Sequence, residues 1–464
     1  MEAMKQEKLC RRQDTALASA ASKLAVDEDD PLAGNYGDIT MEFLQSKTMD
    51  PSAWTRVVNL EKSLEGKHVL IRARVQAIRR VGKKMALLVV REKGFTVQCL
   101  VQEQRDLVSV QMVKYAAALS RESVIDVEGL VSVPSESIKG ATQQVEVQVR
   151  KLYCVSRAPP TLPFNLEDAV RSEAEIEKAL QAGEQPVRVN QDTRLKSRVF
   201  ELRTPANQGI FRIQSQVGNA FRKFLSSEGF VEIYTSKLIA LLNYKGHPVC
   251  RAESPHLHKQ MPIYADVGRV FEIGPVFRVE DSLTPRHLCE VTGLDVEMEI
   301  MEHYDEVVCL NIRYSLNQNC KKELEAVALQ YPFEPLKYLR LTYEEGVQML
   351  KVWHGVLYPL PIPLGWKPIL HNAPCYDNSQ YSNSFNVFIR DSGAQHVHDA
   401  EMLEKRAKTC SIDVKKISTY IDSFRYGVPP HGGFGVGLER LVMHFCGLDN
   451  IHKTTLFPTP GITL

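Results

Sequence analysis

Several features are scarce or absent in this sequence, and each absence excludes a class of protein. The 10 cysteines have no CxxC spacing, so the sequence predicts neither a zinc site nor a disulfide framework. No apolar run is long enough to cross a bilayer, and the start lacks an apolar core behind a basic cap. The formal net charge is only +1, which indicates no general affinity for nucleic acid but allows a local basic face. We expect a soluble intracellular protein without a membrane partner.

The length and the apolar content predict more than one packed domain. The chain has 464 residues, of which 44% are hydrophobic, and this is enough for two or three cores. Residues 1–55 are rich in Ala, Ser and charge, so we expect a flexible N-terminal extension, either a solvated tail or an RNA contact. Residues 159–200 begin with prolines and continue with acidic side chains, which indicates a hinge.

Short strand patterns dominate residues 56–158. Five runs of largely apolar, alternating residues are interrupted by one helical segment, around residues 107–119, after the third run. This order is typical of an OB-fold β-barrel, which binds single-stranded nucleic acid. The strand pattern alone fits any small β-barrel equally well.

A strand, a charged loop and a second strand are expected over residues 271–299. Apolar residues alternate with polar ones on the second limb, which predicts an antiparallel pair. Arg278 and Glu280 lie two apart and would face one side, and Arg286 and His287 follow in the turn. An arginine fork suits a polyphosphate because it binds two phosphate oxygens at once. The alternative is a solvated hairpin with surface ion pairs.

Glycines alternate with larger residues in GGFGVG, residues 432–437, directly before Leu438, Glu439 and Arg440. A backbone without Cβ atoms can pass close to a ligand, and Arg440 would then lie in the first turn of a helix. A glycine-rich turn on its own is a weak indication of a binding site.

Together, FRVE (277–280) and GFGVGLER (433–440) resemble motifs 2 and 3 of class II aminoacyl-tRNA synthetases, FRxE and GxGxGxER. The similarity continues through VNQDTRL, ESPHLHKQM, SGAQ and YIDSFRYGVPPHGG and covers nearly the whole chain. The sequence therefore resembles the eukaryotic cytosolic aspartyl-tRNA synthetases. The resemblance implies an α+β fold, with an N-terminal OB-fold anticodon-binding domain at 56–158. A class II antiparallel sheet flanked by helices would form a catalytic domain at 201–464.

The resemblance also implies an activity and its partners. The expected activity is that of a cytoplasmic aspartate-tRNA ligase, which activates aspartate with ATP and Mg²⁺ and transfers it to tRNA(Asp). A homodimer is implied, built by an amphipathic helix at 208–228 and the strand after it; a plain core helix is the alternative. A multi-synthetase complex is a further candidate partner.

Individual roles follow from the matched positions. Arg278, Glu280 and Arg440 would act in catalysis. The ATP site would consist of Arg278, Glu280, Arg286, His287, Leu288, Gly437, Leu438, Glu439 and Arg440. The aspartate site would consist of Ser254, Lys259, Arg278, Asp295, Ser392 and His396. In the barrel, Gln98 and Arg91 would contact tRNA, and no residue is assigned to a metal. Without the motifs, Lys259 and Asp295 would be taken for surface residues.

Several positions depart from the family pattern. His396 replaces the arginine that pairs with the substrate's side-chain carboxylate, and Val291 replaces a phenylalanine that stacks on adenine. Ser236 replaces a proline after the expected interface strand, and Leu87 replaces a base-stacking phenylalanine in the barrel. An imidazole cannot reproduce the permanent charge of an arginine fork. The alternative function is therefore a catalytically impaired paralogue that serves as a tRNA- or protein-binding module.

Overall fold

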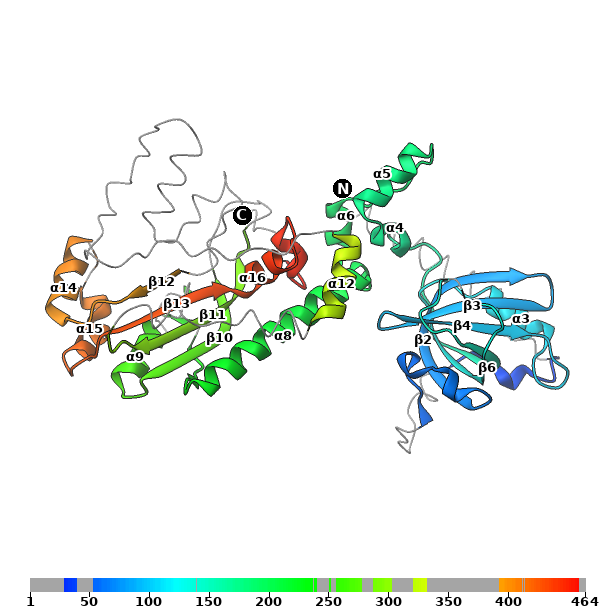
Figure 1. The fold of residues 1–464 in the computed structure, drawn as a ribbon, viewed down its shortest axis with the longest axis horizontal. Coiled ribbons are helices and arrows are strands. Elements are labelled where there is room, and N and C mark those ends of the chain that lie inside the picture. Colours follow the sequence, from blue (N-terminus) through cyan, green and yellow to red (C-terminus); the bar gives the residue numbers. More distant parts are fainter. Residues whose placement is uncertain are drawn as a thin grey trace. The chain divides into compact units, whose positions relative to one another are not determined.

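The computed structural model describes residues 29–39, 53–138, 140–236, 238–239, 250–251, 256–277, 287–302, 320–331, 392–410, 412 and 414–458. Contacts divide the chain into two compact units, residues 1–169 and residues 170–464. The boundary falls inside the segment predicted as a hinge, residues 159–200. Each unit is described by itself, with its elements labelled in Figure 1.

The first unit is a β-barrel with one inserted helix. Its sheet order is β1-β6-β4-β3-β2-β5, and a further pairing of β5 with β6 closes the barrel, with β1 added along β6. The main elements are β1 (Tyr36–Asp38), β2 (His68–Val81), β3 (Met85–Glu92), β4 (Phe95–Gln102), α3 (Val110–Ala117), β5 (Val124–Ser132) and β6 (Glu146–Ser156). Alternate residues of each long strand are fully buried, as in β3, where Ala86, Leu88 and Val90 are buried. The predicted order of five strands with a helix after the third is confirmed.

One stretch of the expected N-terminal extension is part of this barrel. Strand β1 pairs in parallel with β6, with Tyr36 opposite Leu152. The Tyr115 hydroxyl donates a hydrogen bond to Asp38 Oδ1 at 2.6 Å, and Arg157 forms an ion pair with the same carboxylate. This corrects the prediction of a flexible extension over residues 1–55 for the stretch 29–39, because pairing and buried contacts outweigh its polar composition. The rest of the predicted extension before residue 53 lies outside the described residues.

The second unit is built on a five-stranded sheet with the order β12-β13-β11-β10-β7. Neighbouring strands are antiparallel except for β7, which runs parallel to β10. The strands are β7 (Val231–Glu232), β10 (Arg269–Phe277), β11 (Glu290–Glu299), β12 (Ser392–Gln395) and β13 (His431–Gly437). The predicted antiparallel pair over residues 271–299 is confirmed, with Phe271 opposite Val296. A separate two-stranded ribbon consists of β8 (Leu238–Ile239) and β9 (Cys250–Arg251).

The two faces of this sheet differ in chemistry because side chains alternate along a strand. On β11, Leu294, Val296 and Met298 belong to a buried apolar core, whereas Asp295 and Glu297 point to the other face. Helix α8 (Pro205–Ser227) covers the apolar face, as its position along the sheet in Figure 1 indicates. The apolar face therefore provides the core, and the polar face is left for chemistry.

The apolar side chains of α8 are buried in this core. Ile213, Val217 and Phe221 have no exposed surface, and the Phe221 ring packs edge-on against Phe271 with centroids 5.8 Å apart. Gly209 lets a second helix, α12 (Lys321–Gln330), approach α8 closely. These three side chains are therefore covered by the chain's own core, and the expected dimer interface on helix 208–228 and the strand after it stays a prediction.

The other described α-helices, and one 3-10 turn that contacts the site, complete the account of the elements. They are α4 (Leu166–Val170), α5 (Glu173–Gln181), α6 (Gln191–Lys196), α7 (Arg198–Glu201), α9 (His256–Tyr264), α14 (Ala400–Thr409), α15 (Ser418–Phe424), α16 (Leu438–Phe445) and the 3-10 turn η6 (Ile451–Thr454).

A buried arginine ties the start of the second unit to η6. The Arg198 guanidinium donates to Glu201 Oε2 at 2.7 Å and to Asn207 Oδ1 at 3.2 Å. It also donates to four backbone carbonyls, at distances from 2.6 to 3.3 Å, those of His452, Lys453, Thr455 and Leu456. A buried charge is stable only with such partners, so Arg198 holds this turn in place.

Candidate active site

The predicted site residues divide into those that the structure describes and those that it does not. Ser254, Arg278, Glu280 and Arg286 lie outside the described residues. Ser392 is described only through the backbone of β12, where it lies opposite Gly435 of β13. The other predicted residues of the second unit lie on β11, β13, α9 and α16 or directly beside these elements.

The polar face of the sheet combines carboxylates with glycines. Register pairing places Glu297 opposite Gly433 and Asp295 opposite Gly435. A Cβ atom on Gly433 would lie 2.2 Å from Glu297 Oε2 and 2.1 Å from the Val296 carbonyl oxygen. A Cβ atom on Gly293 would likewise lie 2.5 Å from Asp295 Oδ2. Glycine is therefore required at these positions because the carboxylates occupy the space of its missing side chain.

Helix α9 directs Lys259 onto these carboxylates. The lysine is 1% exposed, and its Nζ donates to Asp295 Oδ1 at 3.4 Å, to the Val296 carbonyl at 3.2 Å and to the Phe434 carbonyl at 3.2 Å. An ammonium group has three hydrogens, so all of its donors are in use. Lys259 and Asp295 are brought together as predicted, as a buried pair and not as surface residues.

Glu297 was missed by sequence reasoning, although it lies two residues after Asp295 and therefore on the same face. Its carboxylate is fully buried, with Oε2 3.5 Å from Lys259 Nζ and Oε1 3.3 Å from His396 Nε2. Neither oxygen has a partner with hydrogen-bond geometry. Burial acts to raise the pKa of Glu297, but the close contact and charge of His396, with Lys259 and His431, hold that pKa below its ordinary value. Glu297 is therefore ionised although its side chain is buried.

His396 is the more accessible of the two basic groups beside Glu297. Its side chain is 27% exposed, and its backbone N–H donates to the His431 carbonyl at 2.9 Å. The two imidazole rings lie with centroids 5.5 Å apart. The predicted residues Lys259, Asp295 and His396 therefore form one cluster with Glu297, which we call the charged cluster.

A buried polar layer supports the charged cluster. The His431 Nδ1 donates to the Pro429 carbonyl at 3.0 Å, and its Nε2 lies 3.2 Å from the Tyr264 hydroxyl. The hydroxyls of Tyr264 and Tyr420 both donate to Gln260 Oε1, at 2.9 and 2.6 Å. Burial lowers the pKa of His431 and raises that of Tyr420 to about 12, so both groups are uncharged near neutral pH.

The glycine-rich strand leads directly into α16, as the sequence predicted. Gly437 ends β13 and is the N-cap of the helix, whose first residues are Leu438, Glu439 and Arg440. The Glu439 carboxylate is buried and accepts a hydrogen bond from the Thr292 backbone N–H at 2.9 Å. Burial raises the pKa of Glu439 above its ordinary value. This hydrogen bond therefore connects β11, the strand after the FRVE motif, to the helix that begins at the end of the GFGVGLER motif.

His287 and Leu288 lie immediately before β11. The Leu288 side chain is part of the apolar core, so only its backbone could reach a nucleotide. The His287 carbonyl lies 3.2 Å from His452 Nε2 on η6, and Thr454 Oγ1 donates to the Glu439 carbonyl at 3.1 Å. The turn η6 thus contacts both motif regions.

The two predicted tRNA contacts lie on neighbouring strands of the barrel. Arg91 is largely buried, and its Nη2 forms a salt bridge of 2.9 Å with both carboxylate oxygens of Glu122. Gln98 is half-buried and lies opposite Glu146. Arg91 is therefore engaged within the barrel and could meet RNA only through its remaining exposed edge.

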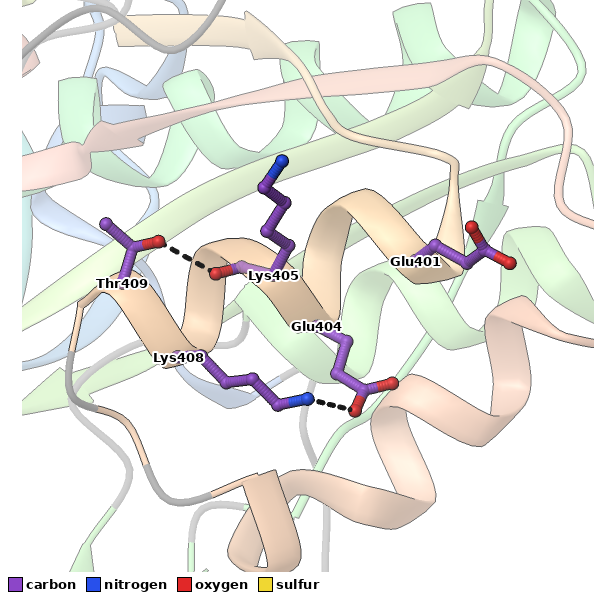
Figure 2. A pocket seen from close by; sticks show the side chains of 5 residues that line it. All are labelled: Glu401, Glu404, Lys405, Lys408 and Thr409. Carbon is purple, nitrogen blue, oxygen red and sulfur yellow. Dashed lines mark hydrogen bonds and ion pairs between the residues drawn. The ribbon is translucent and has the colours of Figure 1, made fainter.

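A shallow hollow on α14 is lined by this one helix alone. Figure 2 shows Glu401, Glu404, Lys405, Lys408 and Thr409 around it. Lys408 Nζ donates to Glu404 Oε1 at 2.9 Å, an ordinary pair of residues four apart on an exposed helix. The hollow contains none of the predicted site residues.

Two searches of the described part of the chain gave negative results. No group of three or more His, Cys, Asp and Glu side chains there could hold a metal ion. No helix within the same described ranges is long and apolar enough to cross a membrane.

Comparisons with known proteins agree with this geometry. The family "tRNA synthetases class II (D, K and N)" matches residues 190–460. Aspartate–tRNA ligase 1, cytoplasmic, of Arabidopsis thaliana is 50% identical over 98% of this chain and 94% of its own length, and the human cytoplasmic enzyme is 41% identical over 91% and 93%. The solved aspartyl tRNA synthetase of Entamoeba histolytica is 35% identical, with a TM-score of 0.79 over 93% of this chain and 96% of its own. The chain belongs to the aspartate–tRNA ligase family of class II tRNA synthetases.

Proposed function

We propose that this protein is a cytoplasmic aspartate-tRNA ligase. Family membership supports the reaction class, and the relatives carry that activity and location in their names. The observation that carries the proposal is the charged cluster, in which Lys259, Asp295, Glu297 and His396 meet on the polar face beside the glycine strand. Such a buried set of ionic groups suits the recognition of a small charged substrate.

In the first step, a carboxylate oxygen of aspartate attacks the α-phosphorus of ATP, and pyrophosphate leaves. The protein contributes positioning and charge stabilisation in this step. Arg278 would bind the α-phosphate, and Glu280 would hold the adenine or position the tRNA end. Arg286 with His287 would meet the outer phosphates, and Arg440 would lie over the adenine and γ-phosphate. Gly437 would let the strand backbone approach the nucleotide.

The charged cluster would recognise aspartate. Lys259 donates its three hydrogens to Asp295 and two backbone carbonyls. It would therefore attract the substrate's carboxylate by its charge and not by a direct hydrogen bond. His396 has exposed surface and would meet the substrate's side-chain carboxylate, with Ser254 and Ser392 beside it. Selection of aspartate over asparagine would then depend on the charge of an imidazole.

In the second step, the terminal adenosine hydroxyl of tRNA(Asp) takes the aspartyl group, and AMP leaves. The barrel would bind the anticodon, with Gln98 at a base and Arg91 at its edge. Leu87 offers no aromatic face, so a base–aromatic stack worth about 1–3 kcal/mol would be missing at that position. Binding in the barrel would therefore depend on polar contacts.

A homodimer is part of the proposal, with β7 and the exposed side of α8 at its interface. Val231 is 49% exposed and Tyr234 is 82% exposed, and β7 is the last strand of its sheet. Exposed apolar side chains on a sheet edge are suited to pairing with a second copy. A multi-synthetase complex would be a further assembly of this dimer.

Magnesium would supply charge neutralisation of the phosphates when it enters with ATP. The described residues provide no cluster of ligands that would hold the ion on their own. No step is therefore assigned to a protein-bound metal, and the described side chains act by binding and orienting the substrates.

Aspartate-driven exchange of pyrophosphate into ATP tests the proposal directly. Exchange with aspartate, and not with asparagine or lysine, is the expected result. The alternative, an impaired paralogue that serves only as a binding module, is not supported by the similarity to ligases over nearly the whole chain. Absence of exchange with every amino acid, in a folded protein that still binds tRNA, would overturn the proposed activity.

A further inference from the structure

The charged cluster has an excess of negative charge in its buried part. Asp295 and Glu297 are two carboxylates, and Lys259 is the one ammonium group that lies between them. Lys259 gives a hydrogen to Asp295 but none to Glu297, because its other two hydrogens go to backbone carbonyls. A buried carboxylate that is left without a partner is costly. The charge of Glu297 must therefore be balanced from its other side.

The other side of Glu297 is occupied by His396. The Oε1 atom lies 3.3 Å from His396 Nε2, and the histidine is the member of the described cluster that reaches solvent. A carboxylate at this distance can fix the orientation of the imidazole ring from its buried side. Among the described ionisable groups, Glu297 on β11 and His431 on β13 lie beside His396, and Lys259 on α9 lies 3.5 Å from the other oxygen of Glu297.

We propose that Glu297 is a positioning residue of the amino-acid site, which holds His396 from its buried side in the orientation that accepts the substrate's carboxylate. The inference rests on the proposed function and deepens it. Glu297 itself does not touch the substrate, because it is fully buried. Gly433 serves the same arrangement, since any side chain there would displace the Glu297 carboxylate.

The test measures pyrophosphate exchange by the full chain and by Glu297→Gln, a variant of equal size without the charge. We expect the KM for aspartate to rise by about tenfold or more, while the KM for ATP changes by less than about twofold. In a His396→Ala background, Glu297→Gln should have little further effect on the KM for aspartate, because the residue through which it acts is gone. Glu297→Asp keeps the charge and should recover part of the loss.

Glu272→Gln is the matched control. Glu272 is a buried carboxylate on the same sheet face, but its partners are the Thr235 backbone N–H at 3.0 Å and hydroxyl at 2.7 Å. This variant should lower the thermal stability without raising the KM for aspartate selectively. Thermal unfolding of every variant establishes that each is folded.

Three outcomes would overturn the inference. Glu297→Gln could raise the KM values for aspartate and ATP alike, which would indicate a merely structural role. It could raise the KM for aspartate equally with and without His396, which would exclude action through the histidine. Third, the unaltered chain could exchange pyrophosphate normally while Glu297→Gln shows unchanged kinetics.

A separate result would concern the proposed function. If the unaltered chain neither exchanges pyrophosphate nor binds aspartate by calorimetry, the proposed function and the inference are both wrong.

Discussion

The carboxylate of Glu439 accepts a hydrogen bond from the backbone N–H of Thr292 at 2.9 Å, across 147 residues of sequence. Thr292 is on β11 and Glu439 is in the first turn of α16, so this bond joins the strand after the charged loop to the helix after the glycine strand. One buried acidic side chain therefore adds to the β11–β13 pairing that already holds the two motif segments together.

Replacing Glu439 with glutamine should change the pH dependence of stability. Burial raises the pKa of Glu439, so the folded state retains the proton to higher pH than the unfolded state. Its ionisation therefore costs stability as the pH rises from the ordinary value of 4.5 through the raised value. Relative to the unaltered chain, Glu439→Gln should gain roughly 1 kcal/mol between pH 4 and pH 7.5. Urea unfolding at both pH values measures this; an equal difference at both would contradict it.

Replacing Gly433 with alanine should destabilise the second unit. The new Cβ atom would lie 2.1 Å from the Val296 carbonyl oxygen, and backbone cannot move aside as a side chain can. We expect a loss of roughly 1–3 kcal/mol in thermal unfolding experiments. Gly437→Ala is the control, because the nearest atom to its Cβ would be Arg440 Cβ at 3.8 Å and its φ is −74°. Equal losses in both variants would show that the close contact is not the cause.

Replacing His396 with arginine should raise aspartate activation. Arginine remains charged at every working pH, whereas an imidazole changes its charge between about pH 5 and pH 8. Activation of aspartate by the variant should therefore exceed that by the unaltered chain between pH 6 and pH 7.5. Pyrophosphate exchange across this pH range measures the difference. Equal or lower activation by the variant would show that His396 does not bind the substrate carboxylate.

Replacing Arg440 with alanine should weaken ATP binding by about tenfold or more, because a charged contact to the nucleotide is lost. Calorimetric titration with ATP measures the affinity. Val291→Phe should strengthen binding in the same assay, since an aromatic platform for the adenine would be restored. An undiminished ATP affinity in Arg440→Ala would refute the assignment of this residue to the nucleotide site.

Replacing Tyr234 with aspartate should dissociate the proposed dimer. The side chain is 82% exposed in the single chain, so its replacement should not affect folding. Sedimentation should then show a dimer for the unaltered protein at micromolar concentration and a monomer for the variant. A dimer that survives this change would place the interface elsewhere on the surface.

Local sequence patterns predicted the positions of helices and strands better than they predicted the side-chain contacts of the site. Alternation along β11 identified Leu294 and Val296 as core residues, and the same alternation puts Asp295 and Glu297 on one face. It could not show that Glu297 is fully buried, because its burial comes from α9 and from the strand that carries Gly433. The family resemblance identified Lys259 and His396 as candidate site residues. Their hydrogen-bond partners depend on contacts between residues that are distant in sequence, which the sequence pattern does not show.

The apolar stripe on α8 illustrates the same limit of local patterns. Helical spacing showed that Ile213, Val217 and Phe221 form one apolar stripe, and this was correct. Periodicity does not say which surface covers such a stripe, and here it is the chain's own sheet. The polar composition of residues 29–39 likewise concealed their pairing with β6, because three residues of ladder and a few buried contacts leave almost no compositional signature.

The contacts of Arg198 bear on the order in which the protein can fold during its synthesis. Four of its acceptors are carbonyls that lie 254 to 258 residues later in the chain. Until they emerge from the ribosome, the buried guanidinium lacks most of its partners, and α7 cannot reach its final state at acceptable cost. The barrel, whose strands all lie before residue 157, has no such dependence. The nascent barrel can therefore be folded while the second unit is still incomplete.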